Sequence, residues 1–318
     1  MSTGTPSPTG ARTTLVIGAG GRHGGTGSHV VRRLRERRHE VRVLVRTDDE
    51  RAQHLRDLGA RIVVGDLLDQ PTLGAAVRGV DAVYFTYPVA PGIVQAAANL
   101  AAALRQAGSS PRLVVMSMAV AAADNPSGLG RAQWAAEEVL GWAGLEPTIL
   151  RFAALFYENI PLLHAESIRR SGAFGNSFGA AVVPWISGLD AADLAVTALL
   201  DPARYPRGST HYPQGAAAHS HADIAALIGA ETGTPVTFTA IPAARWRREI
   251  EDLADSTGTA VNSAMAQHIS AIGAGFARLP AAPPADTTAL AAAIGRPPQT
   301  FTEYVRAHRH HFVPAHAR

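Results

Sequence analysis

The sequence contains no cysteine and no lysine, and all 29 of its basic residues are arginine. Without cysteine, the chain has no disulfide, no thiolate nucleophile and no cysteine-ligated metal. Without lysine it has no Schiff-base former. Arginine cannot replace lysine as a tunable proton donor, because its guanidinium group stays protonated. Mechanisms that need an active-site lysine or cysteine are therefore excluded.

Long apolar runs are also missing, since no stretch approaches the ~18 apolar residues of a membrane helix. The opening residues, MSTGTPSPTGART, are rich in Ser, Thr, Pro and Gly and lack the apolar core of a signal peptide. We therefore expect a disordered tail over residues 1–12 and a cytoplasmic protein that does not bind membranes.

The charge is small and dispersed, with a net value of +3. The densest basic cluster is RRLRERRHE at residues 32–40, a pattern typical of a solvated helix face, so nucleic-acid binding is not expected. The histidines, including the HRHHF cluster at 308–312, lack the i, i+4 pairing with an acid that zinc enzymes show. We expect no metal site and interpret the terminal cluster as a solvated tail.

The first half of the chain alternates apolar, β-branched runs with helical patterns. Strands of this kind are typical of a parallel sheet that helices cover on both faces. Repeated strand–helix–strand units predict an α/β fold with a Rossmann-like, doubly wound parallel sheet. The predicted strands are TTLVIGAG, EVRVLVR, ARIVVGD, VDAVYFTYP, PRLVVMSMA and PTILRFA, and the predicted helices include 27–38, 48–58, 91–107 and 130–143.

After residue 155 the pattern loosens, which predicts a smaller C-terminal α/β lobe over 156–318, interleaved with the first unit, 13–155. We interpret RSGAFGNSFGAAVVPWIS as a hairpin or loop, DAADLAVTALL and HSHADIAALIGAETG as helices, and PVTFTAI as a short strand. This lobe should pack at the carboxyl edge of the sheet, where open α/β sheets bind ligands.

The stretch IGAGGRHGGTGSHVV, residues 17–31, joins the first strand to a helix that should start near Ser28. Glycine allows positive φ and lets a pyrophosphate approach bare backbone, while the helix N-terminus offers N–H groups and a positive dipole end. The stretch predicts a dinucleotide-binding loop. Its candidate cofactor-binding residues are Gly18, Gly21, Arg22, Gly24, Gly25 and Thr26.

Arg46 ends the second strand, where NAD-specific folds usually carry an acid for the ribose hydroxyls. An arginine at this position suits a 2′-phosphate, so we expect NADP(H) to be preferred over NAD(H). Asp48 and Asp49 follow closely and keep NAD open.

The third and fourth strands end in further candidates. Asp66 and Leu67 should meet the adenine, although Asp66 is equally suited to capping the following turn. Thr86 and Tyr87 should approach the nicotinamide-side ribose, an expectation that rests on fold geometry alone.

The order of segments resembles the NmrA-like family, whose members are atypical short-chain dehydrogenases/reductases. The matching segments are GDLLDQPTLGAAVRGVDAVYFTYP, AAEEVLGWAGLEPTILRFAALFYENI, DAADLA, HSHADIAALIGAETGTPV and AIGRPPQTFTEYVRAHRHHF. The resemblance implies an NAD(P)-binding Rossmann domain over 13–155, a substrate-binding lobe and a cleft between them. Members include quinone or dye reductases, isoflavone-type reductases, and redox-sensing regulators that bind the cofactor without turning it over.

Two features depart from the family pattern. The glycine loop carries about three extra residues around Arg22 and His23, which either add a contact to the pyrophosphate or block the site. Gln133 stands where the family often has a lysine that steadies the nicotinamide ribose and aids proton transfer. Glutamine keeps a hydrogen bond but delivers no proton, and the Tyr-x-x-x-Lys pair of the superfamily is absent.

Candidate catalytic residues are Tyr87, Ser117 and Tyr157, each of which has an alternative role in packing or capping. Phe152, in a family segment beside the nicotinamide, is either pocket wall or core. We expect an NAD(P)H-binding oxidoreductase that reduces a quinone or another conjugated small molecule by hydride transfer, and we leave a homodimer open. The alternatives are an NADP-binding sensor without catalysis and a non-redox cyclase or isomerase of natural-product biosynthesis.

Overall fold

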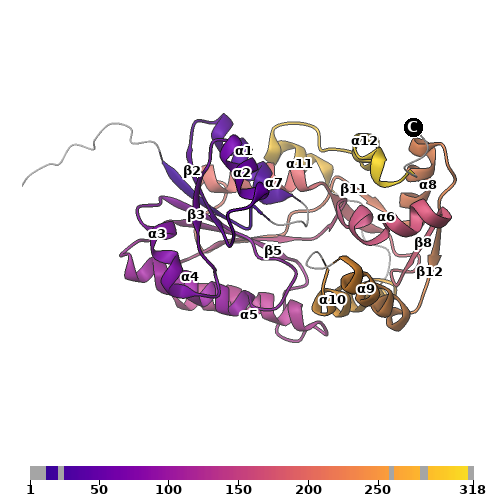
Figure 1. Ribbon diagram of the computed structural model, residues 1–318, viewed down its shortest axis with the longest axis horizontal. Coiled ribbons are helices and arrows are strands. Elements are labelled where there is room, and N and C mark those ends of the chain that lie inside the picture. Colours follow the sequence, from indigo (N-terminus) through magenta and orange to yellow (C-terminus); the bar gives the residue numbers. More distant parts are fainter. Residues whose placement is uncertain (1–11, 21–24, 258–260, 280–285, 314–318) are drawn as a thin grey trace, which may run out of the picture.

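The computed structural model describes residues 12–20, 25–257, 261–279 and 286–313 (Figure 1). The tail predicted over 1–12 lies outside these ranges up to residue 11. The main sheet has seven parallel strands in the order β10-β6-β5-β4-β1-β2-β3, which confirms the prediction of a Rossmann-like sheet. The strands are β1 (Thr13–Ile17), β2 (Glu40–Val45), β3 (Arg61–Val64), β4 (Ala82–Phe85), β5 (Arg112–Met118), β6 (Thr148–Phe152) and β10 (Thr210–His211).

Helices cover both faces of this sheet, which fills the left side of Figure 1. Alternate residues of a strand feed two apolar cores: Val114 belongs to the core under α1 and α7, while Leu113 and Val115 belong to the core under α4 and α5. The first face carries α1 (Thr26–Glu36), α2 (Glu50–Asp57), α7 (Gly188–Leu200) and α11 (Thr287–Ile294). The second carries the 3-10 helix η1 (Gln70–Leu73), α3 (Gly74–Val77), α4 (Ile93–Gln106) and α5 (Gly128–Trp142).

A third apolar core lies in the C-terminal lobe, on the right of Figure 1. Its strands are β7 (Leu155–Phe156), β8 (Ala173–Asn176), β9 (Val183–Ile186), β11 (Ala217–His219) and β12 (Thr237–Ala240), which form the small sheets β11-β9-β7 and β12-β8. Its helices are α6 (Asn159–Ser171), α8 (His221–Thr232), α9 (Ala243–Thr257), α10 (Ser263–Phe276), α12 (Phe301–Ala307) and the 3-10 helix η2 (Arg309–His311).

Of the two alternatives for residues 170–187, a hairpin or a loop, the hairpin is not formed. β8 pairs in parallel with β12, whereas β9 pairs with β11 and β7 in another sheet. Asn176 turns the chain after β8, because its side-chain oxygen accepts a hydrogen bond from the Phe178 N–H, 3.1 Å away. The glycines and the asparagine of this stretch therefore mark a crossing between two sheets.

The HRHHF cluster is not a solvated tail. Phe312 is only 3% exposed and packs in the third core, and Arg169 donates to the His311 carbonyl at 2.9 Å. The buried aromatic ring anchors this turn, because its burial removes a large apolar area from water.

Segments from both halves of the chain build the main sheet layer. β10 extends the sheet beyond β6, and α7 and α11 share the apolar core of the α1 face. The boundary at residue 155 stays a prediction. Among the residues that the structure describes, no helix combines the length and the apolar character that crossing a membrane requires.

Candidate active site

The turn after β1 is packed too tightly for side chains. Gly18 has φ +86°, and a Cβ on it would lie 2.5 Å from Thr86 Cγ2, so Thr86 covers this turn. A Cβ on Gly27 would lie 2.4 Å from the Ala19 Cα. Glycine at both positions lets the turn, the first turn of α1 and the end of β4 approach one another closely.

The N-terminus of α1 faces this turn. Gly25, with φ +57°, occupies the N-cap position, and Thr26 begins the helix. No side-chain hydrogen bond from the described residues caps it, and its first turn holds no acid that would neutralise the positive dipole end. The candidates Gly21, Arg22 and Gly24 lie outside the described residues, so the role of the loop extension stays a prediction.

Arg46 is the exposed cation at the end of β2, and it forms no ion pair with any residue in the described ranges. Both nearby acids already have partners. Asp49 caps α2 and pairs with Arg51, and Asp48 pairs with Arg56 at 2.5 Å. Arg46 is therefore the group at this strand end that has charge to offer a ligand.

The loop after β3 is held by its own turn and by α4. Asp66 Oδ1 accepts a hydrogen bond from the Leu68 N–H at 2.9 Å, so the capping role predicted as one alternative exists. The Leu67 carbonyl accepts from Asn99 Nδ2 at 2.7 Å. These bonds fix Asp66 and Leu67 at the edge where an adenine is expected.

Tyr87 lies near Arg46 and Asp66. Burial raises the pKa of the Tyr87 phenol, the Asp66 charge raises it further, and the Arg46 charge lowers it, so all three groups are within electrostatic reach. The hydroxyl donates to the Pro91 carbonyl at 3.2 Å. The structure thus brings Tyr87 together with the adenosine-side candidates, which does not support a role as the acid beside the nicotinamide.

A buried polar network lies at the end of β5. The Ser117 hydroxyl donates to Glu137 Oε1, and Glu137 Oε2 accepts from Arg151 Nε at 3.0 Å and Nη2 at 2.5 Å. Arg151 Nη1 donates to the Tyr212 hydroxyl at 3.1 Å. Ser117 was a candidate from the sequence, but Glu137 and Arg151 were not. Arg151 could have been found from strand register, because it is the partner of Ser117 across β5 and β6.

Gln133 lies one helical turn before Glu137 on the same face of α5. It is 6% exposed, and its Nε2 has no hydrogen-bond partner among the described residues. A buried amide nitrogen without an acceptor is destabilising, so such an atom points to a ligand that supplies the acceptor. Since α5 begins at the carboxyl edge of the sheet, Gln133 is nearer that edge than Glu137.

The two aromatic candidates fill cores. Phe152 is 4% exposed, and its ring centroid lies 5.7 Å from that of Phe156. Tyr157 is fully buried, and its hydroxyl donates to the Gln299 carbonyl at 3.2 Å. Burial raises the pKa of the Tyr157 phenol strongly. Tyr157 therefore packs within the C-terminal lobe, whereas Ser117 belongs to the network at the end of β5.

Helix α10 contacts the loops that follow β4 and β5. Ser127 Oγ and His268 Nδ1 are 2.6 Å apart, and Asn262 Nδ2 donates to the Val89 carbonyl at 2.9 Å. Burial lowers the pKa of His268 to about 4, so this ring is neutral at pH 7. The C-terminal lobe thus meets the carboxyl edge of the sheet, as predicted.

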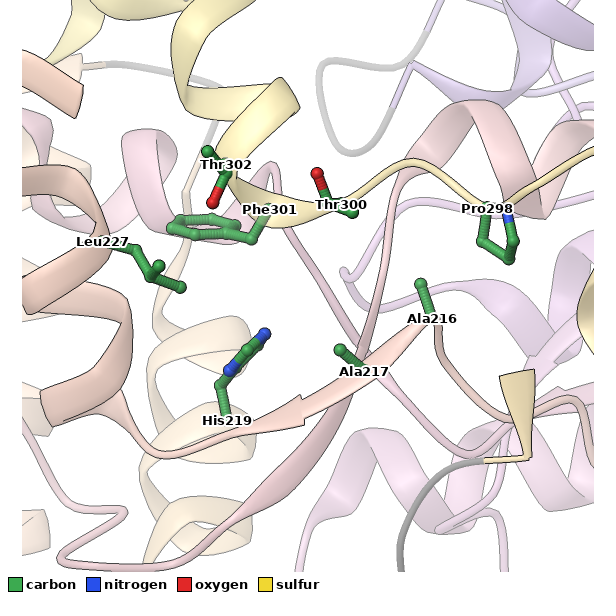
Figure 2. A pocket seen from close by; sticks show the side chains of 8 residues that line it. All are labelled: Ala216, Ala217, His219, Leu227, Pro298, Thr300, Phe301 and Thr302. Carbon is green, nitrogen blue, oxygen red and sulfur yellow. The ribbon is translucent and has the colours of Figure 1, made fainter. Parts of the chain in front are cut away.

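Two hollows lie elsewhere in the described part of the protein. One of about 420 Å³ separates β11 from the start of α12, with the His219 ring pointing into it (Figure 2). It is lined by Ala216, Ala217, His219, Leu227, Pro298, Thr300, Phe301 and Thr302, none of them a predicted site residue. Another of about 290 Å³ adjoins the glycine turn and is lined by Ala19, Gly20, Ser28, Glu50, Arg51, His54 and Leu55.

The described residues fit a dinucleotide along the carboxyl edge of the main sheet, from Arg46 to Ser117, which we call the cofactor edge. Among the described residues, the glycine turn leaves bare backbone at a helix N-terminus, Arg46 forms no ion pair, and the Gln133 amide at the other end has a donor without a partner. Within the described residues, no group of three or more His, Cys, Asp or Glu side chains could hold a metal ion.

Comparison with known proteins identifies the family. The model of the NmrA-like family matches residues 11–304, so the chain belongs to the NmrA-like family. An NAD(P)H azoreductase of Xenophilus azovorans is 32% identical over 307 residues, which cover 92% of this chain and 97% of that protein.

Solved structures share the fold. The NADPH-dependent quinone oxidoreductase of Escherichia coli, complexed with NADPH, superimposes with a TM-score of 0.76 at 21% identity, covering 94% of this chain and 99% of that one. The triphenylmethane reductase of Citrobacter sp., complexed with NADP(H), gives a TM-score of 0.75 at 20% identity, covering 93% and 99%.

Proposed function

We propose that this protein is an NADPH-dependent reductase of planar, conjugated small molecules, with quinones and azo compounds as the first classes to test. One observation carries the proposal. The cofactor edge ends at the buried Ser117, whose hydroxyl already donates its hydrogen to Glu137. The named activities of the azoreductase and the quinone oxidoreductase support the same classes.

In this proposal, each group of the cofactor edge binds a different part of one dinucleotide. The N–H groups at the start of α1 would bind the pyrophosphate, and Arg46 would bind the 2′-phosphate that distinguishes NADPH from NADH. Asp66 and Leu67 would border the adenine. Gln133 would donate its free Nε2–H to a hydroxyl of the nicotinamide ribose, which would satisfy the buried amide.

When bound, a reduced nicotinamide supplies the hydride that the acceptor receives. The protein has to hold that acceptor beside Ser117 and Gln133, and helix α10 limits the access of water. A quinone spreads the resulting negative charge over its ring and takes its proton from water. Tyr87 and Tyr157 are not needed for this step.

The test is a spectrophotometric assay of NADPH oxidation with a quinone panel, an azo-dye panel and a panel of unactivated ketones. We expect turnover with the first two panels and little with the third. Brisk turnover of simple ketones would show that the site contains an acid after all.

The lack of a lysine acid also favours a second function, a sensor that binds NADPH without turning it over. Tight NADPH binding combined with no turnover on any panel would select the sensor. A failure to bind either dinucleotide would contradict both functions and favour the non-redox cyclase or isomerase.

A further inference from the structure

The single hydrogen of the Ser117 hydroxyl already forms a hydrogen bond within the protein. Ser117 is 7% exposed, and its hydroxyl donates to Glu137 Oε1. A carboxylate accepts hydrogen bonds and has none to give back, so the serine oxygen keeps only its lone pairs for a ligand. Toward the cofactor edge, Ser117 is an acceptor and not a donor.

Arg151 holds the carboxylate in this role. The Glu137 side chain is 2% exposed, and its Oε2 receives two hydrogen bonds from Arg151, which leaves Oε1 for Ser117. Burial lowers the pKa of Arg151, but the hydrogen bonds and charges of Glu137 and, to a smaller extent, Tyr212 together raise it above its ordinary value. The ion pair is therefore neutral overall and fixed in geometry by contacts from two guanidinium nitrogens.

We propose that Glu137 and Arg151 are positioning residues that hold Ser117 as a hydrogen-bond acceptor, and that this arrangement excludes unactivated ketones and aldehydes from the substrates. The inference rests on the proposed function. In each turnover the acceptor gains one hydride, with its two electrons, and one proton from water, against oxidation of one dinucleotide. A simple carbonyl becomes an alkoxide before that proton arrives.

A localised alkoxide needs a nearby hydrogen-bond donor, and removing one such donor typically slows a reaction about 10²- to 10³-fold. Ser117 as held cannot donate, and Gln133 is engaged with the ribose in the proposed complex. Quinones and azo groups delocalise the charge and tolerate the missing donor. The network thus selects the substrate class through the direction of one hydrogen bond.

The experiment reverses that hydrogen bond without leaving an orphaned charge. In a variant with Glu137→Gln and Arg151→Met, the new amide can donate to Ser117, and the serine hydrogen becomes available to a ligand. The readouts are the ratio of ketone to quinone turnover, the NADPH dissociation constant from calorimetry and the melting temperature. We expect the ratio to rise at least about tenfold.

Two further variants serve as controls for the change in the ratio of ketone to quinone turnover. Adding Ser117→Ala should return it to the wild-type value, because the gain requires the hydroxyl. The pair Glu231→Gln with Arg306→Met removes an ion pair of 3.1 Å in the C-terminal lobe and should leave the ratio unchanged. If the first double variant unfolds, Glu137→Gln alone makes the same test: its amide oxygen can still accept from Arg151, which is 18% exposed and keeps its bond to Tyr212, so the loss of stability should be smaller than in Glu137→Ala.

A purely structural pair would lower both turnover rates together and leave their ratio constant. A constant ratio in a variant that still binds NADPH overturns the proposal, as does a gain that survives Ser117→Ala. Absence of NADPH binding in the wild-type protein would instead refute the proposed function.

Discussion

The proposed adenosine and nicotinamide ends of the cofactor edge differ in where their charge lies. At the adenosine end, Arg46 is exposed at the tip of β2 and has no ion-pair partner in the part of the chain that the structure describes. At the nicotinamide end, Ser117, Gln133 and Glu137 are all buried, and Arg151 is neutralised by a carboxylate. Charge is available to a ligand at one end and paired inside the protein at the other.

Because of this difference, we expect one end to determine the affinity for the cofactor and the other to determine which substrates react. An exposed cation attracts a phosphate whatever the rest of the ligand is, and its contribution adds to that of the helix N-terminus. A buried neutral network attracts little, but it sets which hydrogen bonds a reacting group can form. We therefore expect substitutions at the adenosine end to change binding and those at the nicotinamide end to change stability and substrate choice.

Breaking the buried ion pair should have the largest effect. Glu137→Ala leaves Arg151 without its carboxylate, and we expect the free energy of unfolding in urea to fall by about 3 kcal/mol. Glu231→Ala removes a pair whose arginine is 67% exposed and should reduce stability by less than about 1 kcal/mol. Equal losses in the two variants would contradict the distinction between buried and exposed charge.

The glycine turn comes next. Gly18→Ala would place a Cβ 2.7 Å from the Thr86 carbonyl oxygen at a φ of +86°, so the turn must move. We expect NADPH affinity to fall about 100-fold in calorimetry, a loss of roughly 2.7 kcal/mol. Gly141→Ala on α5, whose Cβ would meet nothing within 4 Å, is the control and should bind normally. Unchanged affinity in Gly18→Ala would show that the turn does not carry the pyrophosphate.

Arg46→Ala tests the charged end directly. Loss of a charge-assisted phosphate contact is worth about 1.5–3 kcal/mol, which is roughly a tenfold to hundredfold loss of NADPH affinity. NADH, which lacks the 2′-phosphate, should bind as before. The matched control is Arg61→Ala, since Arg61 is an exposed arginine at the amino end of β3. Equal NADPH and NADH affinities in the wild type would remove the basis for this prediction.

The smallest effect concerns Glu158, a buried carboxyl group that, unlike Glu137, has no partner cation among the described residues. Burial raises the pKa of Glu158 to about 7, and its Oε2 has no hydrogen-bond partner there. The unfolded chain releases this proton near pH 4.5, so the group's contribution to stability is lost as the pH rises from about 4.5 to 7.

Glu158→Gln cannot titrate. The difference in unfolding free energy between variant and wild type should therefore grow by about 2 kcal/mol from pH 5 to pH 8, in favour of the variant. Urea unfolding at the two pH values measures this difference, and a difference that does not change with pH contradicts the assignment.

The sequence was most informative where one residue type meets one local requirement. Apolar runs predicted six strands of the main sheet, and all six are found where expected. The glycine-rich stretch predicted a turn after the first strand, and Gly18 has the positive φ that such a turn requires. Arg46 and Gln133 became candidates because each replaces a residue type that the fold or the resemblance led us to expect, and their roles stay predictions.

Other features could not be read, because they depend on which distant segments meet. Arg151 is far from Ser117 in the chain and becomes its neighbour only through the pairing of β5 with β6. Tyr87 follows β4 as predicted, but its hydroxyl donates to the Pro91 carbonyl and lies within electrostatic reach of Asp66 and Arg46. The crossing between β8 and β9 depends likewise on the late strand β12.

Competition between the two halves of the cofactor tests the central claim most directly. NADPH bound to the wild-type protein is displaced in calorimetry either by 2′,5′-ADP, which carries the adenosine end, or by nicotinamide mononucleotide. We predict that 2′,5′-ADP competes at least about 100-fold more tightly, because Arg46 and the α1 N-terminus supply charge while Ser117 and Gln133 supply only hydrogen bonds. Equal or tighter competition by nicotinamide mononucleotide would contradict it.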